Sequence, residues 1–379
     1  MRFTRGIAVV VLALFAGNAV HAGVLPEERT DIAYQLYTGG GVDINVPHVL
    51  VRKQAGSSLS FVGSYYIDMV SSASIDVITT ASPYDEERKQ WSLGMDYLRG
   101  NTIMTVNYTS TEESDYDGST FSFGVSQDMF GDLTTISLSY AYSDDIVGNS
   151  SDPTFEEELK RQQYGVGLTQ ILSRNLISTL NFTVITDEGY LNNPYRSVRY
   201  ADPGTALGYS YEPELYPNTR TSSALGVRLK YYLPWRAAVE GEYRYFTDTW
   251  DIDSNTASLT YIQPFGRWTF TAKYRWHDQT GAAFFSDLFP RPEATNFRGR
   301  DKELSPLTSS TIRLAAAYEF IGGAEGWKFI KKASVNASVD LLHVDYHEFK
   351  DLSTGAPFPD EPLYELDAAI IQLFVSFWY

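Results

Sequence analysis

Charged side chains occupy alternate positions in four otherwise apolar segments of the second half of the chain. Fixed charges on one face of neighbouring strands can line a pore, which then selects solutes by its electric field and by its width. The same charges can instead pair across strands, where each pair contributes about 0.2–1 kcal/mol, and so stiffen or fill the interior. The sequence leaves both interpretations open. The residues are Arg228, Lys230, Glu240, Glu242, Arg244, Lys273, Arg275 and Arg313.

Three ligand-type side chains alternate near the end of the chain, at His343, Asp345 and His347. Imidazole and carboxylate donors suit transition metals, so these residues are candidate metal ligands. Alternate residues of a strand lie about 7 Å apart, so the three side chains would have to converge on one ion. The competing interpretation is a solvated polar end of a strand.

The dipeptide His277-Asp278 invites comparison with hydrolases, which need a nucleophile or water held by an oriented His. The chain is rich in Ser and Asp, but no spacing singles out a nucleophile. It contains no Cys, which excludes a Cys nucleophile, a thiolate metal site and a disulfide framework. We therefore expect a protein without enzymatic activity and without a cofactor.

Short segments of alternating apolar and polar residues would position these charges. Alternation with a period of two predicts β-strands, because successive side chains leave opposite faces. Segments of about ten residues have the length that a tilted strand needs to cross a bilayer. The clearest are residues 102–110, 121–126, 135–142, 225–231, 239–245, 268–276 and 312–320.

Short and long connections alternate strictly from Ser58 onward. This alternation is typical of a transmembrane barrel with short periplasmic turns and long outer loops. Fourteen strands are expected from Ser58, and a hairpin of residues 31–37 and 45–53 around Gly39-Gly-Gly41 would make sixteen. The short turns are expected at residues 99–101, 130–132, 173–175, 233–235 and 264–266, and the long loops at 71–88, 112–118, 143–158, 187–219, 248–254, 279–306 and 348–363.

One expected strand, residues 335–346, changes its parity. Its apolar residues occupy one face as far as Leu341 and the other face from Leu342 onward. A β-bulge near Leu341, or emergence of the strand above the bilayer, would explain the change.

The last strand ends the chain on an aromatic residue. In bacterial outer-membrane barrels, such a closing strand carries the pattern that the barrel-assembly machinery reads. The alternative is that this segment is the buried last strand of a soluble β-sandwich protein. The apolar face that would form the signal is Ile371, Leu373, Val375, Phe377 and Tyr379.

The amino terminus has the form of a secretory signal peptide. Arg2 and Arg5 precede an apolar run at residues 7–15, and a small-residue cleavage site ends at Ala22. The net charge of −17 argues against nucleic-acid binding, which needs clustered cations. Aromatic residues make up 15%, led by 27 Tyr, as expected where rings lie at membrane–water interfaces.

Several stretches resemble a family of outer-membrane barrels known as domain of unknown function 3570. The resemblance covers nearly the whole chain after residue 22 and implies the barrel independently of the strand count. It also implies envelope redox partners, because members of the family are encoded beside periplasmic flavin-attachment and thioredoxin-like proteins. The matching stretches are residues 39–42, 49–53, 71–77, 81–88, 130–135, 216–221, 232–237, 243–250 and 301–305.

We therefore predict a signal peptide at residues 1–22, an amino-terminal segment at 23–57 that supplies the first hairpin of the barrel, and an antiparallel barrel of 14–16 strands at 58–379. The barrel is expected in outer-membrane lipid with both termini in the periplasm. The first functional hypothesis is a porin-like pore, or a transport or scaffold component for a small solute. The alternatives are a barrel that serves a periplasmic redox or export system and, third, a surface hydrolase.

Overall fold

A computed structural model of the chain describes residues 23–70, 86–321 and 329–379. The predicted signal peptide at residues 1–22 and most of the loop expected at 71–88 lie outside the described residues.

The described residues form one closed antiparallel barrel of sixteen strands, so the upper value of the predicted strand count is confirmed. Each strand pairs with its neighbours along the chain, and β1 closes the barrel by pairing with β18, with Arg29 opposite Trp378. The strands of the barrel are β1 (Arg29–Gly39), β2 (Val42–Ala55), β3 (Leu59–Val70), β4 (Glu86–Arg99), β5 (Thr102–Glu112), β6 (Tyr116–Met129), β7 (Thr134–Gly148), β8 (Glu156–Ser173), β9 (Leu176–Gly189), β12 (Thr219–Tyr232), β13 (Ala238–Asp248), β14 (Asp253–Phe265), β15 (Trp268–Gln279), β16 (Leu307–Ile321), β17 (Lys332–Lys350) and β18 (Leu363–Trp378).

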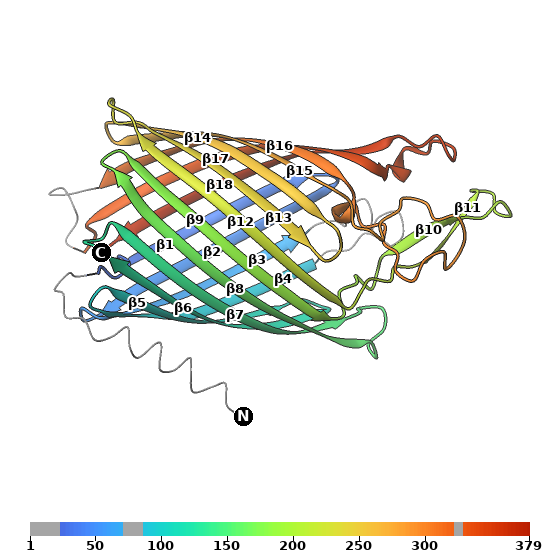
Figure 1. Cartoon of the computed structure of the whole chain (residues 1–379), viewed down its shortest axis with the longest axis horizontal. Helices are drawn as coiled ribbons and strands as arrows, with labels where there is room; N and C mark the ends of the chain where they lie inside the picture. Colours follow the sequence, from blue (N-terminus) through green and yellow to red (C-terminus); the bar gives the residue numbers. More distant parts are fainter. Residues whose placement is uncertain (1–22, 71–85, 322–328) are drawn as a thin grey trace.

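The two ends of the barrel differ (Figure 1). At one end, tight turns join the strands, and Gly100 and Gly266 adopt φ of 61° and 62°, a backbone region that favours glycine. This turn end also holds the carboxyl terminus. At the other end, the loop end, long connections project beyond the strands.

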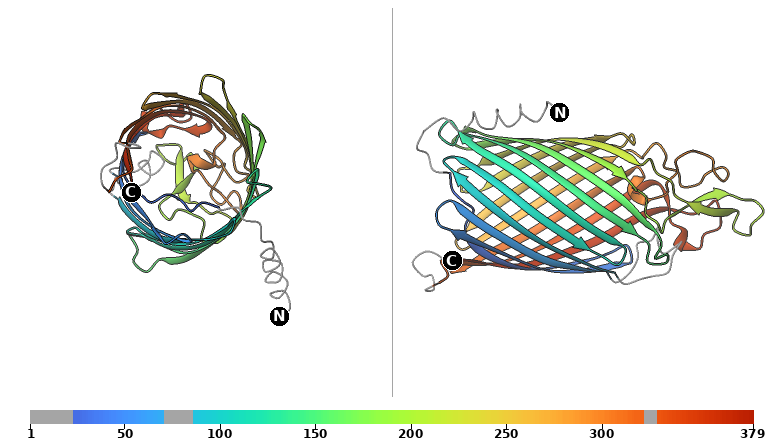
Figure 2. Two further views of the ribbon diagram at one scale, coloured as in Figure 1. Left: turned by 90° about the vertical axis from the view of Figure 1, so that its left-hand side faces the viewer. Right: turned by 90° about the horizontal axis from the view of Figure 1, so that it is seen from below.

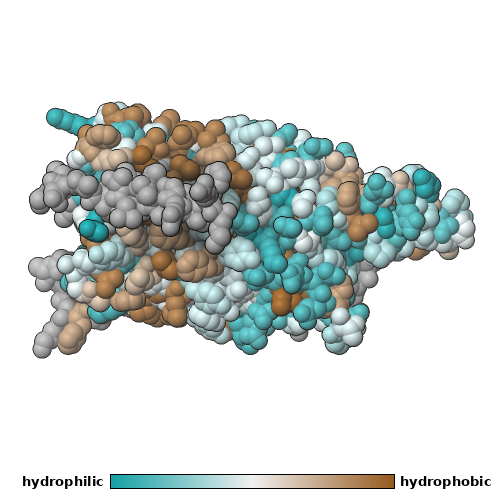
Figure 3. Space-filling model, turned by 60° about the horizontal axis from the view of Figure 1, so that its bottom comes forward, coloured by the Kyte–Doolittle hydropathy of each residue, from teal (hydrophilic) through white to brown (hydrophobic). Residues whose placement is uncertain are grey.

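Apolar side chains on the outside of the barrel form a belt that covers only part of its height. On β8, the outward-facing Tyr164, Val166 and Leu168 are exposed near the turn end, whereas Glu158 and Lys160 form an outward ion pair near the loop end. Figure 3 shows apolar side chains gathered over the turn-end half and polar ones over the loop-end half. No helix among the described residues has the length and apolar character needed to cross a membrane.

Three connections fold together at the loop end, and we call them the cap: residues 190–218, 280–306 and 351–362. The first contains a hairpin that the sequence did not predict, β10 (Ser197–Ala201) with β11 (Tyr209–Pro213). The other two contain the short helices η1 (Lys302–Leu304) and η3 (Leu352–Thr354). Viewed along the barrel axis, parts of the cap lie within the ring of strands (Figure 2).

The cap has apolar cores that pack onto the inner wall of the barrel. In one, the rings of Tyr216, Trp250 and Phe284 lie 5.1–5.6 Å apart. In the other, Val344 and Tyr346 of β17 belong to a cluster against which Phe285 of the cap packs. The parity change of this strand therefore reflects inward apolar side chains beneath the cap. Pairing with β16 continues regularly through Leu341, so the expected bulge there is wrong.

Candidate functional site

Charged side chains on β12, β13, β15 and β16 form rows across the inner wall of the barrel. They have the parity opposite to the exposed apolar residues of the same strands, such as Leu229, Tyr243 and Tyr274. Strand register places the eight charged residues predicted from the sequence in three adjacent rows. The rows are Lys230–Glu240–Thr260–Lys273–Arg313, Arg228–Glu242–Ser258–Arg275–Thr311 and Gly226–Arg244–Thr256–His277–Ser309.

Three of the six cations in these rows are paired with carboxylates. Arg228 lies 3.3 Å from Glu242, and Lys230 lies 3.7 Å from Glu240. Arg313 donates two hydrogen bonds to Asp340, which follows it in the register on β17. This part of the wall therefore has the cross-strand ion pairs that one of the two sequence interpretations expected.

Arg244, Lys273 and Arg275, which we call the cation triad, form no ion pair with any residue that the structure describes. The guanidinium of Arg244 lies over the ring of Phe246, 5.4 Å from its centroid. Lys273 stands directly opposite Arg313, an arrangement of like charges that is unfavourable across strands. The triad therefore gives this wall three positive charges without a paired carboxylate.

The wall formed by β5–β9 contrasts with this charged wall. In two adjacent rows its inward positions carry uncharged side chains, most of them small, and sixteen-strand barrels are wide enough for a water-filled channel. Register places Thr105, Gly124, Ser139, Gly165 and Thr183 in one row, and Ser126, Ser137, Gly167 and Asn181 in the next. The lumen thus has a cationic wall and a second wall of mostly short polar side chains on β5–β9, which we call the smooth wall.

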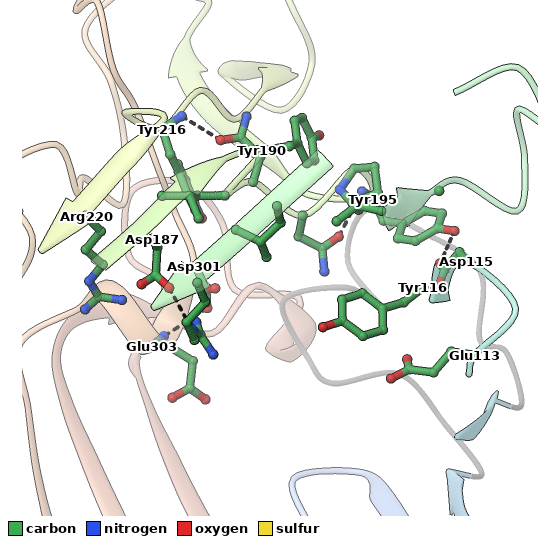
Figure 4. A pocket seen from close by; sticks show the side chains of 18 of the residues that line it. Glu113, Asp115, Tyr116, Asp187, Tyr190, Tyr195, Tyr216, Arg220, Asp301 and Glu303 are labelled. Carbon is green, nitrogen blue, oxygen red and sulfur yellow. Dashed lines mark hydrogen bonds and ion pairs between the residues drawn. The ribbon is translucent and has the colours of Figure 1, made fainter. Parts of the chain in front are cut away.

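A cavity of about 620 Å³, which we call the vestibule, lies between the cap and the loop end of β4–β9. Side chains from the barrel rim and from the cap line it together (Figure 4). Its three guanidinium groups are each matched by a carboxylate on a neighbouring strand or connection, Arg88 by Glu113, Arg161 by Asp187 and Arg220 by Asp248.

Phenol groups add hydrogen-bonding capacity to the vestibule. Burial, and then the hydrogen bond to Asp115, raise the pKa of Tyr195 above its ordinary value. Burial is also the main cause of the raised pKa of Tyr190. Both phenols therefore remain protonated at neutral pH and can donate hydrogen bonds. This site could not be recognised from the sequence, because its residues come from distant segments without common periodicity.

A buried charge cluster holds the three connections of the cap together. Arg199, of which 1% of the side chain is exposed, pairs with Asp287 and with Glu361. Arg300 lies 2.9 Å from Asp287, and its guanidinium lies 4.4 Å from the centroid of the Phe349 ring. The backbone N–H of Lys350 also donates to Asp287. The carboxylate of Asp287 thus joins the first two connections of the cap to β17.

The candidate metal ligands lie on the outer face of β17 near the loop end. His343 contacts Asp345 through Nε2 at 3.1 Å and Asp367 through Nδ1 at 2.8 Å. His347 instead contacts the hydroxyl of Thr308 at 3.2 Å. Within the described parts of the chain, no group of three or more His, Cys, Asp or Glu side chains is arranged to hold a metal ion.

The carboxyl-terminal strand lies at the seam of the barrel. Ile371 and Leu373 are exposed on its outer face, and Val375 and Phe377 share their parity. Tyr379 donates a hydrogen bond from its hydroxyl to the carbonyl of Arg52, and the ammonium of Lys53 lies 4.5 Å from the centroid of its ring. The last aromatic residue therefore ties the end of β18 to β2 across β1.

Solved structures with a similar fold are outer-membrane proteins. The siderophore receptor PirA from Pseudomonas aeruginosa is 10% identical, with 93% of this chain and 81% of that chain covered and a TM-score of 0.41. OmpT, an outer membrane protein of Vibrio cholerae, is 9% identical, with coverage of 93% and 96% and a TM-score of 0.42. OccK5 (OpdH) of Pseudomonas aeruginosa is 11% identical, with coverage of 94% and 99% and a TM-score of 0.44.

These likenesses concern the fold alone, and no curated protein sequence matches the chain. A family model described as "Protein of unknown function (DUF3570)" matches residues 75–350. The match covers most of the sixteen-strand barrel and includes both the cation triad and the cap connections between β9 and β12 and between β15 and β16. The chain therefore belongs to the DUF3570 family.

Proposed function

We propose that the barrel spans the bacterial outer membrane, with its turn end in the periplasm and its loop end outside the cell. The apolar belt near the turn end supports a bilayer position, and short turns on one side with long loops on the other are typical of such barrels. The signal-like sequence of residues 1–22 supports export across the inner membrane. In this orientation the cap and vestibule face the exterior.

Within that membrane, the protein acts as a passive pore for small solutes. The observation that carries this proposal is the pair of contrasting lumen walls, the cation triad on β13 and β15 and the small polar side chains on β5–β9. A filled lumen would be expected to match its fixed charges with partners and to pack its walls against each other. Solutes would reach the lumen through the vestibule beneath the cap.

Single-channel recording of the purified protein in a planar bilayer tests this proposal. We expect steady unitary currents, because a sixteen-strand barrel with an aqueous lumen conducts ions. Heat-dependent migration on a denaturing gel confirms that the sample is a folded barrel before reconstitution. A folded and inserted protein that passes no current would contradict the pore and would favour a barrel that serves a periplasmic redox or export partner.

A pair of neighbouring substitutions shows whether the current flows through the lumen. Ser139→Trp places a large ring on the smooth inner wall of β7, whereas Leu138→Trp places the same ring on the outer face, where Leu138 is already 54% exposed. We expect the first variant to reduce the unitary conductance and the second to leave it unchanged. Equal conductance in both would mean that ions take another path.

A further inference from the structure

We propose that the cation triad is a binding site for small oxyanions that carry two or more negative charges, such as phosphate esters or dicarboxylates. The site lies on the inner wall at the height of the apolar belt, where Tyr274 and Trp276 occupy the outer face beside it. This inference deepens the proposed pore function and rests on it, because it assumes that solutes reach the lumen.

Charge is the first argument for an anionic ligand. The carboxylates in the same rows, Glu240 and Glu242, form their ion pairs with Lys230 and Arg228. Three positive charges on one wall repel one another, and the surrounding barrel and lipid weaken the solvent screening that would reduce this repulsion. An anion bound between them offsets the repulsion, so the wall has a higher affinity for anions than for neutral solutes.

The strand between the two cationic strands leaves room for a ligand. On β14, the inward residues beside Arg244 and Arg275 are Thr256 and Ser258, and Thr260 lies beside Lys273. These side chains are short, so they leave space over β14, between the two cationic strands, for a bound solute. The hydroxyl of Thr256 contacts His277 at 2.8 Å, and those of Ser258 and Thr260 can donate to an anion.

The donor types indicate the chemical class of the ligand. A guanidinium group presents its N–H donors in a planar fork that fits carboxylate and phosphate oxygens, and the ammonium of Lys273 adds a point charge. Two guanidinium groups and one ammonium group together match a dianion better than chloride, which offers one charge and no fork geometry. The smooth wall of β5–β9, which begins two strands away from β13, supplies small polar side chains and therefore little steric restriction on the rest of the solute.

Inorganic phosphate is the probe for a test that uses two independent measurements on the full chain. Isothermal titration of the detergent-solubilised barrel measures phosphate binding without any need for conduction. Reversal potentials in a KCl gradient, and the reduction of chloride current by added phosphate, measure selectivity in planar bilayers. We expect binding, anion selectivity and a concentration-dependent reduction of the current.

Two variants and a control locate the site. Lys273→Gln and Arg275→Gln remove charge from the triad while leaving the ion pairs of the wall in place, and each is expected to raise the phosphate Kd by about tenfold or more. Lys160→Gln removes a cation from the outer face of β8 near the loop end and is expected to change neither measurement.

The outcomes separate the site from the pore. Conduction without anion selectivity or phosphate binding would overturn the oxyanion site and leave the pore intact. Phosphate binding that the triad variants weaken, in a protein that conducts no ions, would support the site and contradict the pore. Phosphate binding that is the same in the triad variants and in the wild type would place the anion elsewhere and overturn the inference.

Discussion

Arg199 of β10 donates a hydrogen bond from Nη1 to Oε1 of Glu361 over 2.7 Å, although 162 residues separate them in the chain. Both side chains are almost completely buried. The bond joins the connection that follows β9 to the connection that precedes β18, and Asp287 adds the connection between β15 and β16. The position of the cap above the lumen therefore depends on a few buried charges.

Replacing Arg199 is expected to release the cap while the barrel stays folded. Arg199→Met leaves Glu361 buried without its hydrogen-bonded partner and leaves Arg300 as the remaining ion pair of Asp287, a change that costs about 3–5 kcal/mol. Limited proteolysis should then cut residues 190–218 roughly a hundredfold to several thousandfold faster when cleavage follows the open population. Arg291→Met, at an exposed site of the same cap, serves as the control. Equal cleavage of the two variants would contradict the role of the cluster.

The same cluster predicts that acid loosens the cap. Burial raises the pKa of Glu361. The hydrogen bond and charge of Arg199 and the charge of Lys350 together lower it by more than burial raises it, so the pKa in the folded protein lies below the ordinary 4.5. A lowered carboxyl pKa contributes stability fully above pH 4.5, and this contribution is lost as the pH falls through the folded value. Proteolysis by an acid-active protease should therefore accelerate in the cap as the pH falls below 4.5.

Glu361→Gln provides the matched comparison for this pH effect. The amide cannot titrate, so the acceleration of cap cleavage with acid should become smaller in this variant. An identical pH profile in wild type and variant would assign the effect to another group.

Two cations that stand opposite each other on β15 and β16 should differ in their effect on stability. Arg313→Gln leaves Asp340, which is 5% exposed, without its partner and should cost about 1–3 kcal/mol. Lys273→Gln removes a like-charge neighbour and should leave stability unchanged or raise it by about 0.2–1 kcal/mol. Urea unfolding in detergent, followed by loss of the heat-modifiable band, measures both. A larger loss for Lys273→Gln than for Arg313→Gln would refute this assignment of ion pairs.

Removing the aromatic ring of Tyr379 should weaken the seam of the barrel. Tyr379→Ala removes the hydrogen bond to Arg52, worth about 0.5–1.5 kcal/mol, and the contact with the Lys53 ammonium, worth about 0.5–1 kcal/mol. The heat-modifiable fraction in the outer membrane should fall. Phe265→Ala, at another exposed aromatic residue of the turn end, should not reproduce that fall.

The barrel could be predicted from the sequence because its signals are local. The alternation of Leu225, Val227 and Leu229 with polar residues predicts a strand, and the turn glycines at positions 100 and 266 mark where strands reverse. The cap could not be predicted in this way. Its hairpin β10–β11 is short, and its stabilising contacts, such as Arg199 with Glu361, join distant segments.

The candidate site was predictable in composition but not in pairing. Parity alone predicts that Lys273 and Arg313 share the inner face, but strand register and the presence of Asp340 decide which of them is paired. The parity change after Leu341 suggests a bulge or emergence of the strand above the bilayer, because the sequence cannot distinguish an outward apolar side chain from one that packs beneath a cap. Vestibule residues such as Tyr195 and Arg161 meet only in three dimensions.

The apolar belt ends well below the tops of the strands, and this offset determines what the immune system or a phage can recognise. In the proposed orientation, the outward ion pair of Glu158 and Lys160 stands above the lipid on a continuous hydrogen-bonded sheet. The exposed epitopes are therefore rigid surfaces assembled from several strands and a locked cap. Antibodies raised against synthetic peptides copied from single loops should bind the folded protein poorly, whereas antibodies raised against the intact barrel should recognise whole cells.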